Sequence, residues 1–257
     1  MPEPHIAVLT CLWRRPELAR LVLRRYTRIA TDLQGTARLS FLAVGSEGRA
    51  SERLAKSEGW SYVEAANKPL GRKWNVGMRA VRDRLSPDAV VIVGSDDWIN
   101  TAVFEHYVRS LAAGKRFIGF SDIYFLYWKK MKTLYFGGYT HPSRIGEALG
   151  LGRCLHRDVL DKIKWKPWWE SKNNGLDLTM TKTLRSVFSV KELARISDVR
   201  KMVDVGGVLL DIKTPVGICK VHSYLGSKAS KWDDTKRVLS AFPEDERDVL
   251  LALLRRL

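Results

Sequence analysis

Residues 89–98 read AVVIVGSDDW, and this stretch carries the strongest strand signal in the chain. Five apolar residues, from Ala89 to Val93, indicate a buried strand, which ends in glycine, serine and two carboxylates. In open α/β sheets, ligands bind beyond the carboxyl ends of the strands. The stretch therefore predicts a strand and, directly after it, a binding site that contains Asp96 and Asp97.

Three further apolar runs come before this strand, and a helical pattern follows each of them. The predicted strands span 5–12, 37–44 and 60–67, and the predicted helices span 16–29, 50–59 and 71–85. Four strands that alternate with helices imply right-handed βαβ units. We therefore expect an α/β fold with a mostly parallel, Rossmann-like sheet flanked by helices.

The pattern changes after a helix predicted at 101–113. The remaining predicted elements are an aromatic strand pair at 115–130 and 132–140, helices at 157–163 and 175–187, strands at 206–214 and 217–225, and a terminal helix opened by Pro243. No repeat or linker interrupts this order. We expect one domain over 1–257, with a nucleotide-sugar-binding half at 1–113 and a mixed α+β acceptor half at 114–257.

Charge is the outlying property of the composition. The chain has 44 Lys and Arg against 28 Asp and Glu, which gives a formal net charge of +16. A field of this sign attracts polyanions such as nucleic acid, anionic lipid headgroups or phosphorylated small molecules. The basic residues are dispersed along the chain, which predicts a basic folded surface rather than a disordered arm.

Composition also argues against several classes of protein. No run reaches the roughly 18–20 apolar residues of a membrane span, and the N-terminus lacks the pattern of a signal peptide. We therefore expect no integral membrane segment and a cytoplasmic protein. Cys11, Cys154 and Cys219 are widely separated and odd in number, which predicts neither a disulfide framework nor a zinc site.

The adjacent carboxylates Asp96 and Asp97 suit a divalent cation. Hard oxygen ligands at the end of a buried strand favour Mg²⁺ or Mn²⁺, which can bridge the two phosphates of a nucleotide. The alternative is a structural role, in which this segment only caps the helix predicted from 101. Two adjacent carboxylates exceed what one cap needs, so the metal or nucleotide role is favoured.

Four segments share their order and character with a known family. They are HIAVLTCLWRRPEL (5–18), AVGSEG (43–48), NKPLGRKWNVGMRAV (67–81) and VVIVGSDDW (90–98). Together they resemble the nucleotide-sugar half of a GT-A glycosyltransferase, close to glycosyltransferase family 2. The resemblance extends over roughly residues 5–225, and a DNA-modifying enzyme of the phage type is one variety of it that we consider.

The resemblance implies a site for a nucleoside-diphosphate sugar, with a UDP-sugar as the first candidate. In the family, an arginine follows the first strand, an acidic residue near the nucleoside base follows the second, and an N-x-x-x-G-x-x-x-N segment leads into a helix. Arg14, Glu47 and Asn67 stand at these places, and Gly71 and Asn75 complete the third segment.

The fourth segment departs from the family's DXD-type acidic motif. Ser95 stands at the first acidic position, so the resemblance leaves Asp97 for the metal and Asp96 for the ribose or the metal.

The second half of the chain adds two residues by resemblance. LGLGRCLHRDVLDKI (149–163) is similar to the acceptor-side segment of the family, and NNGLD (173–177) lies where an ED-type motif carries the general base. Asp177 is the implied base. In GT-A enzymes a histidine near the C-terminus often binds the metal, and the resemblance therefore implies His222 as a ligand. The alternatives are a helix-dipole contact for Asp177 and a structural role for His222.

The chemistry of sugar transfer adds a further candidate. Transfer requires stabilisation of the departing diphosphate and removal of a proton from the acceptor hydroxyl. Lys73, and with less support Arg72, follows Gly71 and could meet the diphosphate. The alternative for Lys73 is a solvated helix face.

The acceptor site is predicted from aromatic and basic residues. Sugars and unstacked bases both pack on indole rings, so the irregular segment before Asp177 could line an acceptor cleft, although its rings could equally belong to the core. The candidates are Trp165, Trp168 and Trp169 in this segment, and Lys129, Lys130 and Lys132 between the aromatic strands.

These features together favour a metal-dependent glycosyltransferase. The net charge favours duplex DNA as the acceptor, in the form of a hydroxymethylated base that must leave the stack. A lipid-linked or saccharide acceptor is the first alternative. A non-catalytic, basic nucleic-acid-binding protein is the second, although no helix-turn-helix, zinc or RNP signature supports it. A sugar nucleotidyltransferase is disfavoured because the first strand ends in TCLWRRPE, without a glycine-rich loop.

Overall fold

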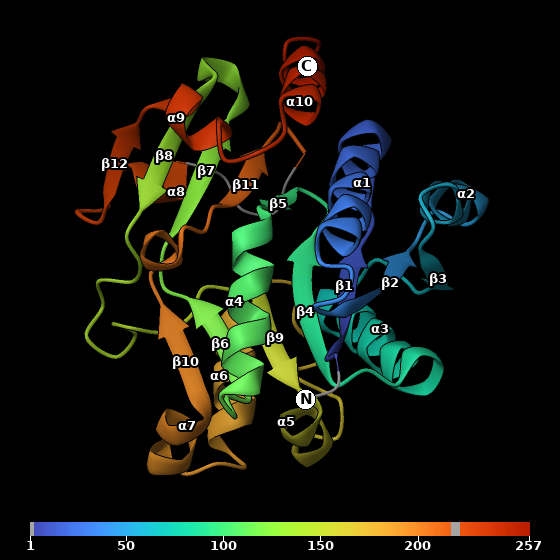
Figure 1. The fold of residues 1–257 in the computed structure, drawn as a ribbon, viewed down its shortest axis with the longest axis vertical. Helices are drawn as coiled ribbons and strands as arrows, with labels where there is room; N and C mark the ends of the chain where they lie inside the picture. Colours follow the sequence, from blue (N-terminus) through green and yellow to red (C-terminus); the bar gives the residue numbers. More distant parts are fainter. Residues whose placement is uncertain (1–2, 217–221) are drawn as a thin grey trace.

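The computed structural model describes residues 3–216 and 222–257, and it places them in two β-sheets with helices around them (Figure 1). The first sheet has the order β10-β6-β9-β4-β1-β2-β3 and the second has the order β12-β8-β7-β11-β5. The strands of the first sheet are β1 (His5–Cys11), β2 (Arg38–Gly45), β3 (Ser61–Glu64), β4 (Ala89–Gly94), β6 (Phe117–Phe120), β9 (Arg153–His156) and β10 (Ser197–Arg200). Those of the second are β5 (Asp97–Ile99), β7 (Ile123–Tyr127), β8 (Lys132–Phe136), β11 (Leu209–Lys213) and β12 (Ser230–Asp233).

Helices connect the strands as the sequence predicts for the first half of the chain. The helices there are α1 (Pro16–Asp32), α2 (Arg49–Ser57), α3 (Leu70–Leu85) and α4 (Thr101–Ala112). The rest of the chain adds α5 (Arg157–Lys162), α6 (Leu176–Arg185), α7 (Val190–Ile196), α8 (His222–Leu225), α9 (Thr235–Leu239) and α10 (Glu244–Leu254), with short 3-10 helices at Trp128–Lys130 (η1) and Met202–Val205 (η2).

The first sheet is mostly parallel, which confirms the predicted fold class. Strands β3, β2, β1 and β4 run parallel, and β9 alone is inserted antiparallel between β4 and β6. The chain moves outward from β1 through β2 to β3 and then returns to the other side of β1 as β4. The strand order thus reverses at β1 and β4, and the carboxyl ends of the strands at such a reversal are the usual ligand site of these sheets.

Side chains alternate between two cores because successive residues of a strand point to opposite faces. In β1, Ile6 and Val8 belong to the core under α1 and α4, whereas Ala7 and Leu9 belong to the core under α3, α5 and α6. Figure 1 shows α4 crossing in front of β6 and β9. Helix α3 approaches the sheet closely at Gly77, where a Cβ would lie 2.4 Å from Cγ2 of Val44.

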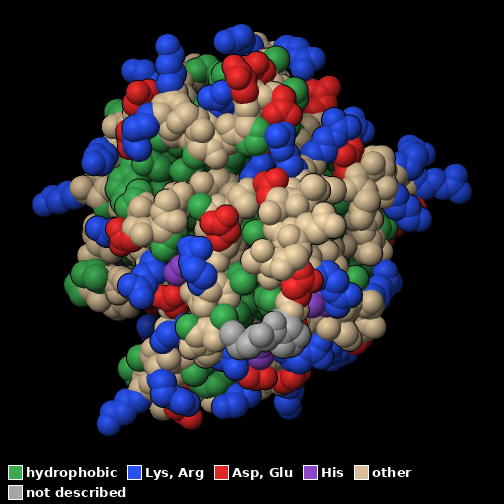
Figure 2. Space-filling view, in the orientation of Figure 1, with side chains coloured by type: hydrophobic (Ala, Val, Ile, Leu, Met, Phe, Trp, Pro, Cys, Tyr) green, Lys and Arg blue, Asp and Glu red, His purple; other side chains and the backbone are tan. Residues whose placement is uncertain are grey.

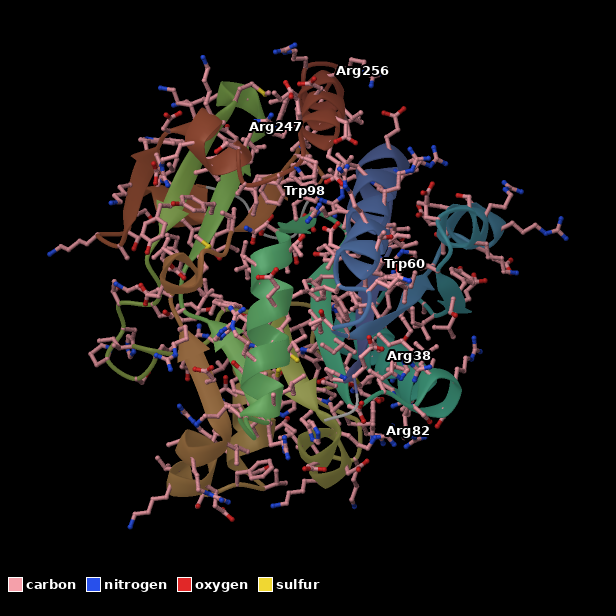
Figure 3. All side chains as sticks on the ribbon, viewed as in Figure 1. Arg38, Trp60, Arg82, Trp98, Arg247 and Arg256 are labelled. Carbon is pink, nitrogen blue, oxygen red and sulfur yellow. The ribbon has the colours of Figure 1, made fainter. Side chains whose placement is uncertain are left out.

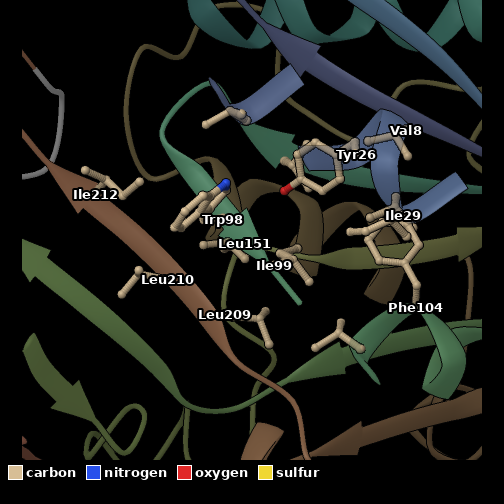
Figure 4. Close-up of a cluster of buried hydrophobic side chains, with 14 of the residues drawn as sticks. Val8, Tyr26, Ile29, Trp98, Ile99, Phe104, Leu151, Leu209, Leu210 and Ile212 are labelled. Atoms are coloured by element: carbon tan, nitrogen blue, oxygen red, sulfur yellow. The ribbon is translucent and has the colours of Figure 1, made fainter. Parts of the chain in front are cut away.

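Side chains of α1 and the ring of Phe242 hold the short strand β5 in place. The Tyr26 hydroxyl donates to the backbone oxygen of Asp97 (2.9 Å), and the buried Arg25 donates through Nε to the oxygen of Ile99 (3.1 Å). Trp98 is fully buried and stacks on Phe242 with ring centroids 4.6 Å apart. Figures 3 and 4 show Trp98 between α1 and β11, with the apolar side chains of Leu209, Leu210 and Ile212 beside it.

The second half differs from the sequence prediction in several elements. The run 115–130, predicted as one strand, is split into β6 and β7, which belong to different sheets. The break falls at Asp122, a fully buried carboxylate that accepts hydrogen bonds from the Met202 amide (2.6 Å) and the Tyr135 hydroxyl (2.9 Å). Strands β9, β10 and β12 were not predicted, because each has only four residues and mixes polar with apolar positions.

The predicted strand at 217–225 lies partly outside the described residues, and 222–225 form α8 instead. Within the described ranges, every helix is too short or too polar to cross a bilayer.

Candidate functional site

Three carboxylates meet where the two sheets join. Asp96 and Asp97 follow β4, and Asp211 stands directly opposite Asp97 in the antiparallel pair of β11 with β5. One oxygen of each carboxylate lies within 4.8 Å of an oxygen of the other two. Gly94 makes room for this arrangement, because a Cβ there would lie 2.8 Å from Oδ1 of Asp96 and 3.0 Å from Oδ2 of Asp97.

Burial and the neighbouring carboxylates oppose ionisation of Asp97 and Asp211. Asp97 is 8% exposed, and burial, with Asp211 and Asp96 nearby, raises its pKa well above the usual range. Burial likewise raises the pKa of Asp211 to about 6, against the lowering effect of Lys213. A cation placed among the three carboxylates would stabilise their charged forms.

Two basic side chains border the cluster without filling it. Arg15 donates through Nη1 to Oδ2 of Asp96 (2.7 Å), and Lys213 donates to Oδ2 of Asp211 (2.5 Å). The other oxygen of Asp211, Oδ1, is buried and accepts no hydrogen bond from any residue that the structure describes. An oxygen-only donor set with a buried, unsatisfied carboxylate oxygen fits a hard divalent cation such as Mg²⁺ or Mn²⁺.

The sequence indicated Asp96 and Asp97 but missed Arg15 and Asp211. Arg14 and Arg15 are adjacent, and a left-handed turn with φ values of 55° and 51° decides which one faces the acidic cluster. Asp211 becomes visible only through the pairing of β5 with β11. Its one sequence signal is a carboxylate that stands between the apolar residues Leu210 and Ile212.

Arg14 and Glu47 are brought together at the carboxyl edge of the first sheet. The backbone amide of Arg14 donates to Oε2 of Glu47 (2.9 Å), which ties the loop after β1 to the loop after β2. The Arg14 guanidinium lies over the ring of Trp13, 4.6 Å from its centroid. Both charged side chains are exposed, so they are open to a ligand at this edge of the sheet.

Lys73 is buried rather than solvated, with 1% of its surface exposed. Its amine donates to the backbone oxygen of Leu12 (2.6 Å), to Oγ of Ser46 (3.1 Å) and to Oδ1 of Asn67 (3.1 Å). Burial lowers its pKa. Lys73 thus joins the loops that follow β1, β2 and β3, and the predicted Asn67 is one of its acceptors.

Gly71 and Asn75 serve the segment that leads to Asp177. The side-chain amide of Asn75 donates to the oxygen of Trp168 (2.8 Å), and the Gly71 amide donates to the oxygen of Lys172 (2.8 Å). A Cβ on Gly71 would lie only 2.2 Å from the oxygen of Trp169. These contacts fix the irregular chain at 168–172 over the start of α3.

The three tryptophans of this segment have different surroundings. Trp165 and Trp168 are 2% and 5% exposed and belong to the core, where Trp168 packs on Trp74 with ring centroids 5.3 Å apart. Trp169 is 44% exposed, and Nζ of Lys182 lies 5.3 Å from its ring centroid. Only Trp169 of the three therefore offers a ring face to an acceptor in this structure.

Asp177 lies in the first turn of α6, beside the loop that leads into β9. Its Oδ2 accepts from the Tyr139 hydroxyl (3.1 Å), and its Oδ1 lies against Gly150. In the same loop, the Gly152 amide donates to the oxygen of Ile92 near the end of β4 (2.9 Å). Asp177 is therefore at the carboxyl edge of the sheet, as is the acidic cluster, and it is partly exposed.

The remaining predicted residues lie elsewhere or outside the description. Lys129, Lys130 and Lys132 are exposed at the turn between β7 and β8 in the second sheet. His222 begins α8, but its side chain lies outside the described residues, and so does Cys219. Figure 2 shows Lys and Arg side chains spread over the visible face with Asp and Glu among them, consistent with a dispersed basic surface.

Comparison with known proteins shows which solved structures have a similar fold. The sequence matches no protein-family model and no curated protein. Its fold is similar to that of S. aureus TarS.

TarS 1–349 in complex with UDP-GlcNAc matches with a TM-score of 0.53 at 12% identity, over 97% of this chain and 66% of that chain. The complex of TarS 1–349 with UDP gives 0.55 at 12% identity, over 82% and 61%. A further TarS structure gives 0.56 at 11% identity, over 98% and 53%. This chain thus spans 53–66% of the length of these TarS chains. At such identity the likeness establishes the fold alone.

Replacing Lys73 with Met tests its role as the tie between the three loops. The change keeps a long apolar stem but leaves the acceptors on Leu12, Ser46 and Asn67 without their shared donor. We expect the free energy of unfolding in urea to fall by about 1–3 kcal/mol. Arg72→Met, on the exposed side of the same helix, is the control and should change it by less than about 0.5 kcal/mol. Equal stability of the two variants would contradict this role.

Proposed function

We propose that this protein is a glycosyltransferase that moves a sugar from a nucleoside-diphosphate sugar, a UDP-sugar first, to a hydroxyl acceptor, with Mn²⁺ or Mg²⁺ as cofactor. The observation that carries the proposal is the cluster of Asp96, Asp97 and Asp211 at the carboxyl edge of the sheet. The similar fold of TarS, whose structures hold UDP-GlcNAc and UDP, supports the choice of donor.

The proposed donor site consists of the loops at the carboxyl edge of the first sheet. Asp97 and Asp211 would hold the cation, and Asp96 would contact the cation or the ribose. When bound, the cation would supply positive charge to the departing diphosphate. Arg15 keeps the carboxylate of Asp96 in place through its 2.7 Å ion pair. His222 is a further proposed ligand.

The other donor contacts come from the loops after β1, β2 and β3. Arg14 and Glu47 would border the nucleoside. Lys73 would support the donor through the loops that it joins, with Asn67 among its partners.

The proton of the acceptor would go to Asp177. As the acceptor oxygen forms its bond to the anomeric carbon, its proton passes to a carboxylate oxygen of Asp177, and the bond from that carbon to the diphosphate oxygen breaks. A general base of this kind contributes roughly 10²–10⁴-fold to the rate.

The proposed acceptor is duplex DNA that carries a hydroxymethylated base. The support is the net charge of +16, because phosphate contacts dominate the affinity of proteins for DNA. The exposed Lys129, Lys130 and Lys132 would contact phosphates, and the exposed ring of Trp169 would receive a base that has left the stack. A lipid-linked or saccharide acceptor would use the same donor chemistry without these contacts.

Metal binding can be tested without an acceptor. If Asp97 and Asp211 hold the cation, saturating Mn²⁺ should raise the melting temperature of the native protein, because a ligand at 100 times its Kd adds about 2.7 kcal/mol to stability. Asp97→Asn and Asp211→Asn should abolish this increase and any EDTA-sensitive turnover of UDP-GlcNAc. Asp204→Asn, at an exposed carboxylate in η2, should keep it. A Mn²⁺ response that survives in Asp97→Asn would overturn the metal assignment.

The DNA acceptor can be tested through salt. If four to six phosphates are neutralised, the slope of log affinity against log salt should be about −4 to −5 for duplex DNA. Replacing two of Lys129, Lys130 and Lys132 with Gln should reduce the slope by about one or two. Binding of UDP-GlcNAc should vary far less over the same range. A flat dependence, or stronger competition by anionic vesicles than by DNA, would reject the nucleic-acid acceptor and favour the lipid-linked or saccharide one.

A further inference from the structure

A surface segment at 138–147, which we call the strap, is tied to both ends of α6. The strap follows β8, and its Tyr139 donates a hydrogen bond to Asp177 in the first turn of that helix (3.1 Å). At its other end, Oε1 of Glu147 accepts from Nη2 of Arg185, the last residue of α6 (3.1 Å). The strap is therefore fixed relative to the helix that carries the proposed base.

Arg144 connects the two ties within the strap. Its guanidinium carbon lies 3.5 Å from the ring centroid of Tyr139, and its Nε donates to Oε2 of Glu147 (2.8 Å). The Tyr139 ring also packs edge-to-face with Phe136, with ring centroids 6.2 Å apart. The position of the Tyr139 hydroxyl is thus set by contacts that do not involve Asp177.

The two oxygens of the Asp177 carboxylate have different surroundings. Oδ2 accepts from Tyr139, whereas Oδ1 receives no hydrogen bond from the described residues and lies over Gly150, where a Cβ would approach it to 2.2 Å. The backbone oxygen of Asp177 accepts from Nη1 of the buried Arg153 (3.2 Å). Arg144 and Arg153 are, with Asp177, the charged groups that act on the Tyr139 hydroxyl.

We infer that Tyr139 is a positioning residue for the reaction: its hydroxyl fixes the rotation of the Asp177 carboxylate and leaves Oδ1 as the oxygen that takes the proton. This inference rests on the proposed role of Asp177 as the base. Burial, with the charge of Asp177, raises the pKa of Tyr139 to about 12, so the phenol stays a hydrogen-bond donor throughout the neutral range.

Tyr139→Phe is the direct test, because it keeps the ring and its stack on Arg144 while removing the hydroxyl. The probe is hydrolysis of UDP-GlcNAc, in which water is the acceptor and loses its proton to Asp177. We expect kcat to fall about 10-fold, since misplacement of a catalytic group by about 1 Å can cost up to about 10²-fold. KM for UDP-GlcNAc and the melting temperature should stay unchanged. An unchanged kcat, or a loss that falls on KM, would overturn the inference.

Tyr135→Phe is the matched control. It removes another tyrosine hydroxyl that donates to a carboxylate, here that of Asp122 (2.9 Å) rather than that of Asp177. We expect its kcat to equal that of the native protein. An equal loss in both variants would show a general effect on packing and would overturn the inference.

Two further variants separate this inference from the proposed function. Asp177→Asn should lower kcat more than Tyr139→Phe does; if it keeps native turnover, the base role itself is wrong and the inference is lost with it. If Asp177→Asn is inactive and Tyr139→Phe is fully active, only the inference fails. Gly150→Ala should reproduce the loss of kcat, because its Cβ displaces Oδ1.

A readout independent of turnover is the crystal structure of the Tyr139→Phe protein. We expect the Asp177 carboxylate to rotate away from its place over Gly150. A carboxylate that keeps its native place would overturn the inference even if no donor is hydrolysed.

Discussion

The antiparallel pairing of β5 with β11 is the constraint on which the site depends. It places Asp97 opposite Asp211 at the junction of the two sheets, next to Asp96. Like charges that are buried together raise the free energy of the folded state unless cations or hydrogen bonds compensate them. A fold that keeps this pairing therefore needs positive charge or hydrogen bonds to offset the repulsion between the carboxylates. For this reason the cluster is a candidate binding site.

The surrounding structure supplies part of this compensation and holds the strand in place. Arg15 and Lys213 each contact one carboxylate. Behind the cluster, the fully buried Trp98 and the hydroxyl of Tyr26 anchor β5 to α1 and to the C-terminal part of the chain. The buried Lys73 does the same for the loops after β1 to β3. Buried hydrogen bonds thus hold together the loops at this edge of the sheet.

The sequence predicted the first half of the fold well, because alternation of buried strands with amphipathic helices is a local signal. It also identified Asp96 and Asp97, which follow the most apolar strand. It could not identify Asp211, because no local pattern in the sequence shows that β11 pairs with β5. The sequence also could not show that Trp165 and Trp168 are buried, since an indole ring in an irregular segment is compatible with a core or with a cleft. The two oxygens of the Asp177 carboxylate have different neighbours, Tyr139 and Gly150, which only the folded chain brings together.

The most direct test of the account is the position of manganese in crystals grown with UDP-GlcNAc and Mn²⁺, measured by anomalous diffraction. The account predicts one strong peak among the carboxylates of Asp96, Asp97 and Asp211, in contact with the diphosphate, with the nucleoside against the loops after β1 and β2. A nucleotide bound elsewhere, or a diphosphate at this edge of the sheet with no manganese among the three carboxylates, would contradict it.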